Sequence, residues 1–343
     1  MKHLLFLVTF SVSMSGLAQN TSSASEYMSY FSSEYLKIQE DMWDYTRSVS
    51  HGRSAKKVEK RRAELIQSTG SALNRAKRAK DFKGDGRYRD SVIHYFFLID
   101  VVLQENYAKI LDMEAVSEQS YDAMEAYMLA REMASDKLKE AGEMINREHR
   151  LFAESNDITI IENESKLDQK IEIANLVYDH YNEVYLVFFK SYKQESYLLD
   201  AISRSDVSAI EQNRNALLDA TEEGLTKLSG IKKYEGDPGM ITSTRQLLNF
   251  YKREAEDDVD AVLHYLETNE RFMKIKEAFD QKKPKSRTQG DVDQFNNGVN
   301  EMNDAATKYN SNNEASNKKR GELVDNWNKA AEKFTNRHVP KGK

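Results

Sequence analysis

Residues 59–85 of the chain read EKRRAELIQSTGSALNRAKRAKDFKGD, and residues 211–237 read EQNRNALLDATEEGLTKLSGIKKYEGD. Aligned without a gap, 152 residues apart, the two segments are identical at eight of 27 positions. Both end in an aromatic residue, one intervening residue and then Gly-Asp. Because self-similarity at a fixed distance is the sequence signature of a repeated unit, we expect a tandem duplication. The alternative is chance similarity between charge-rich helices.

The repeated segments carry the apolar pattern of an amphipathic helix. Val58, Leu65, Ala72 and Ala76 recur at spacings that place them on one face of a helix. The whole chain has only 3 Pro among 343 residues, and its composition is 39% hydrophobic and 31% charged. Few helix breakers and broad polar faces are typical of long helices in slender bundles.

The expected fold is therefore all-α, with two tandem, four-helix, up-and-down bundle-like units that form an elongated molecule. We place the first unit at residues 19–157 and the second at 158–337, followed by a short basic tail at 338–343. Asp206 is the expected N-cap of the sixth helix. The expected helices cover residues 23–50, 54–80, 89–103, 116–154, 165–203, 206–232, 242–281 and 289 onward.

The first 18 residues have the pattern of a signal peptide. After a short basic start, Leu4–Leu17 is mostly apolar, but it is shorter than the roughly 20 residues of a membrane span. Gly16 and Ala18 are the small residues that precede a cleavage site. We expect cleavage between Ala18 and Gln19 and export to the periplasm, the cell surface or the medium. The alternative is a buried N-terminal helix or a membrane anchor; no later stretch is apolar enough to span a bilayer.

The composition excludes several kinds of chemistry. Without Cys, the chain has no disulfide, thiolate zinc site, iron–sulfur cluster, Cys nucleophile or lipid-modified cysteine. None of the six histidines after the signal segment follows a carboxylate by three residues, as the di-iron pattern of helical bundles requires. The sequence contains no phosphate-binding loop and no Gly-x-Ser-x-Gly nucleophile elbow. We expect no cofactor, no metal and no enzymatic activity, with an unrecognised carboxylate site between the two units as the alternative.

The strongest charge asymmetry lies in the second expected helix. Residues 53–83 carry a net charge of +8, whereas the matching residues 205–235 carry −2. Such a segment attracts anionic surfaces, but the overall charge of −6, or −7 once Lys2 is removed, argues against a dedicated nucleic-acid binder. The alternative is a solvated face balanced by acids on neighbouring helices, such as residues 254–260. The candidate anion-binding face consists of Arg53, Lys56, Lys57, Lys60, Arg61, Arg75, Lys77, Arg78 and Lys80.

Two arginines stand at matched positions on the apolar stripes of the repeat. Arg62 follows Glu59 by three residues, and Arg214 follows Glu211 by the same spacing. An arginine on an apolar stripe is costly unless it is paired, so we expect buried ion pairs that fix the helix register. A matched binding site in both units is the alternative.

The matched turns and the fifth helix also have two interpretations each. Asp85 and Asp237 lie beside Gly, where we expect helix termination, because the ligand spacing of an EF-hand is absent. Calcium binding is the alternative there. The tyrosines of the fifth helix are expected in the core with their hydroxyls at its edge, with carbohydrate contact as the alternative. They are Tyr178, Tyr181, Tyr185, Tyr192 and Tyr197.

Several segments carry a resemblance to a known family. They are residues 42–45 (MWDY), 51–55 (HGRSA), 58–62 (VEKRR), 88–92 (YRDSV), 118–127 (EQSYDAMEAY), 187–194 (VFFKSYKQ), 325–328 (DNWN) and 338–340 (HVP). In these segments the chain resembles a family of exported surface proteins of Gram-negative bacteria, first named from a leptospiral member. The resemblance covers most of the mature chain. It implies export and an all-helical build, and it brings no known activity and no catalytic residues.

These observations favour an exported, non-enzymatic helical protein of the bacterial cell envelope or surface that acts in binding or scaffolding. The alternative is a binder of an anionic envelope polymer, either lipopolysaccharide or an acidic glycan, through the basic second helix. The expected partner is thus an envelope protein or such a polymer, and not nucleic acid. The sequence leaves the oligomeric state open.

Overall fold

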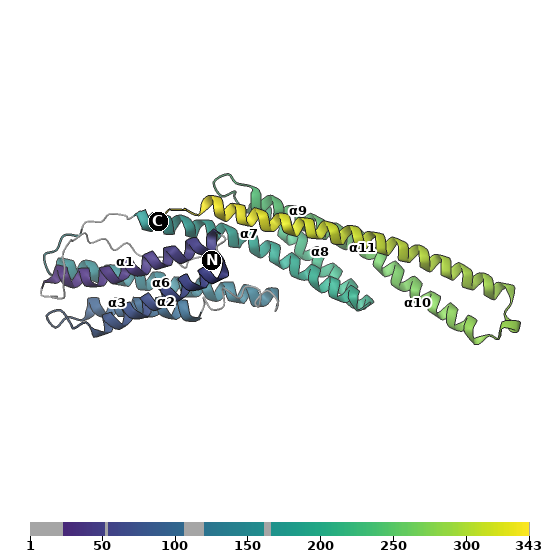
Figure 1. The fold of residues 1–343 in the computed structure, drawn as a ribbon, viewed down its shortest axis with the longest axis horizontal. Coiled ribbons are helices and arrows are strands. Elements are labelled where there is room, and N and C mark those ends of the chain that lie inside the picture. The colour runs from purple at the N-terminus through teal and green to yellow at the C-terminus, as the bar shows by residue number, and fades with distance from the viewer. Residues whose placement is uncertain (1–22, 52–53, 106–119, 161–165, 343) are drawn as a thin grey trace. The chain divides into compact units, whose positions relative to one another are not determined.

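The computed structural model describes residues 23–51, 54–105, 120–160 and 166–342 (Figure 1). Nearly all of these residues are helical, and the described ranges contain no β-strand, only two isolated β-bridges. The predicted all-α fold is confirmed. No helix within these ranges combines the length and the apolar character needed to cross a membrane. The expected signal peptide at residues 1–18 and the candidate residue Arg53 lie outside the described residues.

The chain divides into two compact units. The first contains residues 1–182 and 332–343, and the second contains residues 183–331. Both divisions fall inside long helices, because α7 (Lys166–Ser203) and α11 (Gln289–His338) each contribute residues to both units. The boundary expected between residues 157 and 158 separates two copies of the sequence repeat, whereas the two compact units are defined by their contacts, so that boundary stays a prediction.

Four helices form the main body of the first unit. Each contacts the next along the chain, and the last also contacts the first. Ser23 begins the first of them with a capping box: its hydroxyl accepts from the backbone N–H of Glu26, and the Glu26 carboxylate accepts from the Ser23 N–H. The helices are α1 (Ala24–Ser50), α2 (Ala55–Arg78), α3 (Arg87–Glu105) and α6 (Tyr121–Glu154).

The C-terminal segment packs into the first unit. Val339 is buried, and Trp43 of α1 donates its indole N–H to the backbone carbonyl of Gly342 at 2.9 Å. His51, at the end of α1, lies within hydrogen-bond distance of the Asn336 side chain and of the Pro340 carbonyl, at 3.0 and 3.3 Å. The segment expected as a basic tail is therefore attached to α1 by specific contacts.

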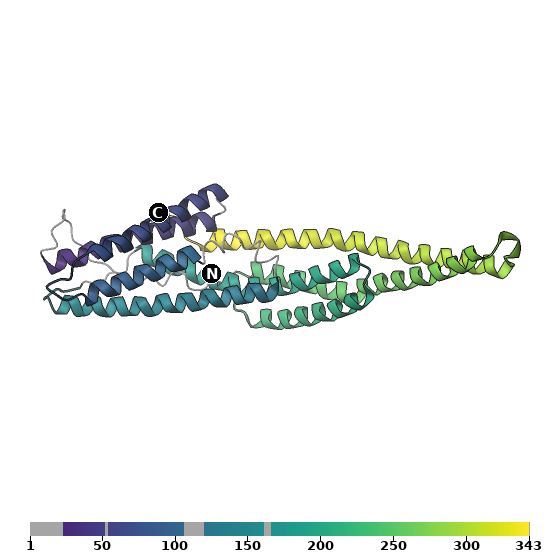
Figure 2. The same cartoon turned by 90° about the horizontal axis from the view of Figure 1, so that it is seen from below.

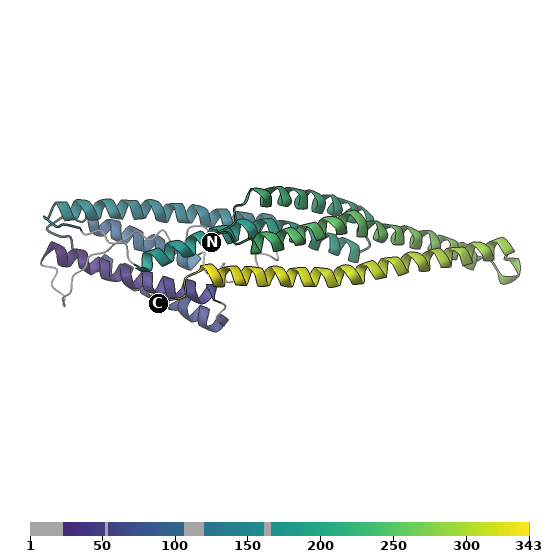
Figure 3. The same cartoon turned by 90° about the horizontal axis from the view of Figure 1, so that it is seen from above.

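The second unit combines the later part of α7 with the helices that follow it (Figure 2). The expected third helix of this unit, residues 242–281, is interrupted by one π-helical turn. Two pairs of stacked rings join α10 to α11, which run side by side in Figures 1 and 3: Tyr265 with Tyr309 and Phe279 with Phe295. The elements are α8 (Val207–Gly230), α9 (Gly239–Arg253), the π-helix η1 (Glu254–Asp258), α10 (Val259–Gln281), the short 3-10 helix η2 (Pro284–Ser286) and α11.

One glycine sets the packing of α8 against its neighbours. A Cβ at Gly224 would lie 2.6 Å from Cδ2 of Leu248 in α9 and 3.1 Å from Cγ1 of Val187 in α7. The absence of a side chain there allows α8 to approach both helices closely. Trp327 of α11 lies in the same unit and donates its indole N–H to the hydroxyl of Thr244 in α9 at 2.9 Å.

The helices of the aligned segments have matching bounds. α2 and α8 each contain 24 residues, and both their first and last residues lie 152 positions apart. α3 and α9 also begin 152 positions apart. Leu65 and Leu217 are fully buried at equivalent positions, as are Thr69 and Thr221. The duplication stays a proposal, and this agreement of helix bounds and burial supports it.

The turns that follow α2 and α8 have the same backbone conformation. Lys83 and Gly84 have φ values of 54° and 87°, and the matching Glu235 and Gly236 have values of 46° and 79°. All four lie in the left-handed region that favours glycine, which accounts for the Gly in both turns. In each turn, the aromatic residue before this pair forms an isolated antiparallel bridge with the Asp after it.

The two aspartates of these turns start the next helices. Asp85 Oδ1 accepts a hydrogen bond from the backbone N–H of Arg87 at 3.0 Å, and Asp237 Oδ1 accepts one from Gly239 at 2.8 Å. Each carboxylate therefore satisfies one of the N–H groups that the first turn of a helix leaves unpaired. Both aspartates thus have a structural role at the boundary between two helices, as expected.

Candidate functional site

Two arginines of α2, Arg61 in its second turn and Arg75 in its last turn, are neutralised by acids of α1 and of α2 itself. Arg61 forms ion pairs with Asp44 of α1 at 3.3 Å and with Glu64 at 2.8 Å. Arg75 pairs with the buried carboxylate of Glu34 in α1 at 2.5 Å. Acids on a neighbouring helix therefore balance part of the basic face, as the alternative interpretation expected, and here that helix is α1.

Residues 254–260 are engaged within the second unit. The carboxylates of Glu254, Glu256 and Asp260 form ion pairs with Arg320, Lys252 and Arg214, respectively. These acids are therefore paired within their own unit. The positive charges of α2 are instead balanced by Glu34 and Asp44 of α1, and by Glu59 and Glu64 of α2 itself.

The remaining cations of the candidate face form two clusters at opposite ends of α2. All of them are exposed, and apart from Lys60, which lies 3.7 Å from Glu64, none has an ion-pair partner among the described residues. Since the helix rises 1.5 Å per residue, the clusters are about 30 Å apart. The N-terminal cluster consists of Lys56 and Lys57, beside the weakly paired Lys60, and the C-terminal cluster consists of Lys77, Arg78 and Lys80.

The matched arginines have different partners. Arg62 makes two hydrogen bonds to Glu59 on its own helix, at 3.0 and 2.7 Å, and these bonds lower the pKa of Glu59. Arg214 bonds instead to Asp260 at 2.7 Å and to the backbone carbonyl of Glu256 at 3.0 Å. The expectation of buried pairs within each helix is wrong: Glu59 is 51% exposed, and Arg214 pairs with a carboxylate of α10. Of these two arginines, only Arg214 joins two helices.

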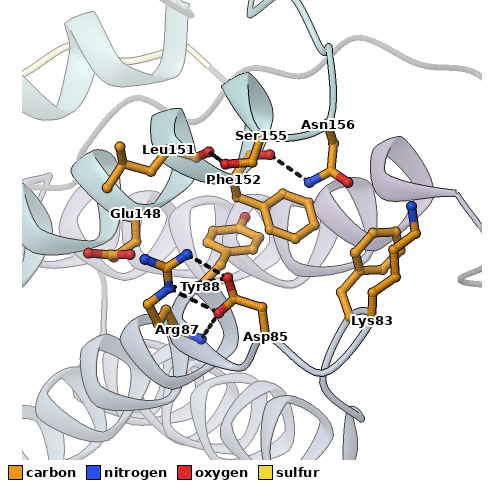
Figure 4. Close-up of a pocket in the computed structure, with 10 residues that line it drawn as sticks. Lys83, Asp85, Arg87, Tyr88, Glu148, Leu151, Phe152, Ser155 and Asn156 are labelled. Carbon is orange, nitrogen blue, oxygen red and sulfur yellow. Dashed lines mark hydrogen bonds and ion pairs between the residues drawn. The ribbon is translucent and has the colours of Figure 1, made fainter.

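A pocket opens at the end of the first unit, between the α2–α3 turn and the C-terminal end of α6 (Figure 4). Its volume is about 140 Å³. Three aromatic rings and a leucine form its apolar part, while charged and polar side chains surround them. The lining residues are Phe82, Lys83, Asp85, Arg87, Tyr88, Glu148, Leu151, Phe152, Ser155 and Asn156.

The aromatic base of the pocket belongs to the core of the unit. Phe82, Tyr88 and Phe152 are buried, and the ring of Phe152 lies 5.3 Å from that of Phe82 and 5.2 Å from that of Tyr88, centre to centre. The Tyr88 hydroxyl lies 3.0 Å from Nδ1 of His149 in α6. Burial lowers the pKa of His149 to about 4 and raises the pKa of Tyr88 well above its usual value, so both groups are neutral at pH 7.

Some of the charged groups around the pocket are ion-paired, and one is not. Arg87 bonds to both oxygens of Asp85, and these bonds lower the pKa of Asp85 to about 2. Lys83 has no ion-pair partner among the described residues, and its ammonium lies 5.2 Å from the ring centre of Phe82. Glu148 lies on the opposite side of the pocket (Figure 4). The pocket therefore presents a cation and an acceptor at separate places above an apolar base.

A cluster of charged side chains that the sequence did not predict is buried in the second unit. Arg320 of α11 forms ion pairs with Glu195 of α7 and with Glu254 at the start of the π-helix. The three side chains are only 14%, 2% and 6% exposed. Burial raises the pKa of Glu195 to about 7 and also raises that of Glu254. One guanidinium faces two carboxylates, so the cluster favours the binding of a proton.

This buried cluster is too enclosed to contact a substrate. The expected alternative of a carboxylate site lay between the two units, whereas this pair lies inside the second one. Its members are 59 to 125 positions apart in sequence, so no short sequence motif could predict that they come together. One signal was available: Glu254 aligns with the buried Val102 of the first repeat, so a carboxylate replaces an apolar residue at a core position.

The tyrosines of α7 serve mainly in packing. Tyr178 is buried, and its hydroxyl shares a short hydrogen bond with Ser50 of α1. Burial raises the pKa of Tyr181 to about 12. Tyr185 lies against aromatic neighbours in the second unit, and Tyr192 is 38% exposed. These positions favour the packing interpretation over a carbohydrate-binding surface on this helix.

Comparisons with protein-family models, with curated proteins and with solved structures found no match to this chain. Within the described residues, no three His, Asp or Glu side chains come together in a way that could hold a metal ion. The features left for a functional interpretation are the end pocket, the two cationic clusters of α2 and the buried cluster around Arg320. Of these, only the first two are open to a partner.

Proposed function

We propose that this chain is an exported, non-enzymatic helical protein of the bacterial cell envelope or surface that acts in binding or scaffolding. The observation that carries the proposal is the use of its charged side chains. Among the described residues, many of those that could support chemistry are engaged in helix starts and ion pairs, while open groups lie at the two ends of α2 and around a small pocket. That distribution suits contact with a partner better than turnover of a substrate.

The signal-like first 18 residues and the family resemblance support the location in this proposal. The signal-like segment predicts that the chain is processed during export, and the resemblance implies that the exporting cell is Gram-negative. The test is expression of the full chain in a Gram-negative host, followed by fractionation and mass measurement of the product. An N-terminus at Gln19 in an envelope fraction is expected. A full-length chain that stays in the cytoplasm would contradict the proposal.

The partner can be sought with the mature protein. Immobilised on a resin and mixed with envelope fractions, it should retain a defined envelope component that a denatured sample does not. Recovery of the same background from both samples would contradict a binding role. Identification of the retained component then separates a protein partner from a polymer.

A second function is favoured by the unpaired cations of α2. In this proposal, the two clusters bind an anionic envelope polymer, either lipopolysaccharide or an acidic glycan. The attraction is electrostatic, so binding should weaken as salt rises from low to physiological concentration. A surface of immobilised polymer and the mature chain in solution provide the measurement.

The charge-reversal variant changes only those cations of α2 that have no ion-pair partner among the described residues. Lys56→Glu, Lys57→Glu, Lys77→Glu and Arg78→Glu change unpaired residues and leave Arg61 and Arg75 in their ion pairs. A matched control reverses four exposed lysines of α11 that also lack ion-pair partners among the described residues: Lys308, Lys318, Lys329 and Lys333. Both variants have the same net charge. Binding that is lost only in the α2 variant supports the proposal, and equal loss in both variants would show that net charge alone matters.

A further inference from the structure

The C-terminal cluster of α2 continues into the pocket. Lys80 is the last residue of the candidate face, and Lys83, three positions later, stands at the pocket itself. Two acids of this region are already paired, since Asp81 pairs with Arg89 and Asp85 pairs with Arg87. Lys83 has no ion-pair partner among the described residues and lies on the other side of the pocket from the remaining carboxylate, Glu148 (Figure 4). The Lys83 side of the pocket therefore favours a ligand that carries an acidic group.

The volume of the pocket limits what can enter it. Sites for whole small molecules and cofactors usually measure roughly 300–1,000 Å³. A cavity of about 140 Å³ is smaller than these. It suits a single ring that belongs to a longer molecule, with the rest of that molecule outside. A polymer that enters with one residue meets this condition.

The polar groups around the aromatic base are suited to hydroxyls. Asn156 donates its side-chain N–H to the carbonyl of Phe152 at 2.8 Å, which leaves its own side-chain oxygen to accept. Ser155 donates to the carbonyl of Leu151 at 2.7 Å and likewise keeps its oxygen as an acceptor. The carboxylate of Glu148 adds two further acceptors. Acceptors around an apolar base fit a ring with hydroxyls on its edge and C–H groups on its face.

The matched turn of the second unit lacks the positively charged side chains of the first. Lys83 is replaced by Glu235, and Arg87 is replaced by Gly239. The backbone conformation is nevertheless the same in the two turns. The cation is therefore not needed to form the turn, so its presence in the first unit calls for another reason.

We infer that the pocket binds one residue of an acidic saccharide. The sugar ring lies against Phe82, Tyr88 and Phe152, its hydroxyls donate to Glu148 and Asn156, and its acidic group pairs with Lys83. The chain beyond that residue runs toward Lys80 and the C-terminal cluster of α2. This inference rests on the second proposed function, and it adds the saccharide class and the residues that recognise it.

The test is a calorimetric titration of the mature protein with three probes. These are a trimer of galacturonic acid, the neutral trimer of galactose and inorganic phosphate. A charge-assisted hydrogen bond contributes about 1.5–3 kcal/mol, so the acidic trimer should bind at least roughly tenfold more tightly than the neutral one. Phosphate that binds as tightly as the acidic trimer would overturn the inference and assign the site to simple anions, such as the phosphates of lipopolysaccharide.

Three substitutions locate the binding. Lys83→Asn removes the charge with a residue that tolerates the left-handed conformation, and Glu148→Gln keeps the shape of the acceptor but not its charge. Each should weaken binding of the acidic trimer roughly tenfold without lowering the melting temperature. The control is Lys232→Glu, at the position of the second unit that matches Lys80, and it should bind like the unmodified chain.

The outcomes also separate this inference from the second proposed function. If Lys83→Asn and Glu148→Gln bind the acidic trimer unchanged, the pocket is not the site and the inference is overturned. The polymer-binding experiment with the α2 charge reversal is independent of that result. Loss of polymer binding there, together with unchanged trimer binding here, would retain the function and reject the pocket.

Discussion

The segment from α2 to α3 and the segment from α8 to α9 have one backbone plan and two different surfaces. Helix bounds, buried leucines and the left-handed turn agree at a constant spacing of 152 residues. The charges do not agree: the first segment is basic and has an end pocket, whereas the second is acidic and leads to the buried Arg320 cluster. The apolar pattern thus defines the shared scaffold, and the polar residues distinguish the two segments.

The buried cluster offers the largest test of that difference. Arg320→Leu leaves two carboxylates buried without their cation, which should lower the free energy of unfolding by about 3–5 kcal/mol. Glu254→Val introduces the residue that the first repeat has at this position, Val102, and leaves Glu195 paired one-to-one with Arg320. Glu254→Val should therefore lower the free energy of unfolding by much less than Arg320→Leu. Denaturant unfolding of both variants gives the measurement, and equal losses would show that the pairing is not what holds this cluster.

The two units should respond to pH in opposite directions. Burial raises the pKa of Glu195 from 4.5 to about 7, so its stabilising proton is fully bound below pH 4.5 and is lost as the pH rises through 7. The pKa of His149 falls from 6.5 to about 4, so the first unit loses stability as the pH drops from 6.5 toward 4. Each shift corresponds to an effect of order 3 kcal/mol.

Single substitutions isolate these two pH effects. Glu195→Gln should flatten the pH dependence of the second unit between pH 4.5 and 7, and His149→Gln should flatten that of the first between pH 4 and 6.5. Amide hydrogen exchange, read separately for α8 and for α3 at several pH values, distinguishes the units. A parallel change of protection in both helices would contradict the expectation.

The smallest effect concerns the starts of α2 and α8. Asp206 accepts a hydrogen bond from the backbone N–H of Ala209 at 3.1 Å, which confirms it as the N-cap of α8. The matching Ser54 makes no such side-chain bond. Asp206→Ala should therefore cost about 1 kcal/mol of stability, and Ser54→Ala close to nothing. Thermal unfolding of the pair measures the difference, and equal costs would mean that Ser54 caps α2 in solution.

The sequence predicted those features that depend on local pattern. The stripe of Leu65 and Ala72 places α2, the Gly-Asp pair predicts where it ends, and the position of Asp206 predicts the start of α8. The pairing of Arg61 with Asp44 or of Arg320 with Glu195 could not be predicted in this way. Such pairs depend on which helices become neighbours and in which register.

The pocket illustrates the same limit. Its residues come from two stretches, 82–88 and 148–156, whose proximity depends on the packing of the α2–α3 turn against α6. The sequence indicated the basic character of the region, but it attributed that character to the whole length of α2. The basic residues lie at the two ends of α2, since residues 63–74 contain no Lys or Arg. The structure adds that Asp44 and Glu34 of α1 neutralise one arginine in each group, Arg61 and Arg75.

The attachment of residue 342 to Trp43 has a consequence for the order of folding. A chain that is synthesised or exported from its N-terminus presents α1, α2 and α3 early, yet the first unit also includes residues 332–343. That unit can be completed only after residue 342 has emerged, since Val339 and Gly342 belong to its contacts. Helices α1, α2 and α3 therefore lack these contacts until residues 332–342 have been made, and the second unit, which ends at residue 331, can form before the first is complete.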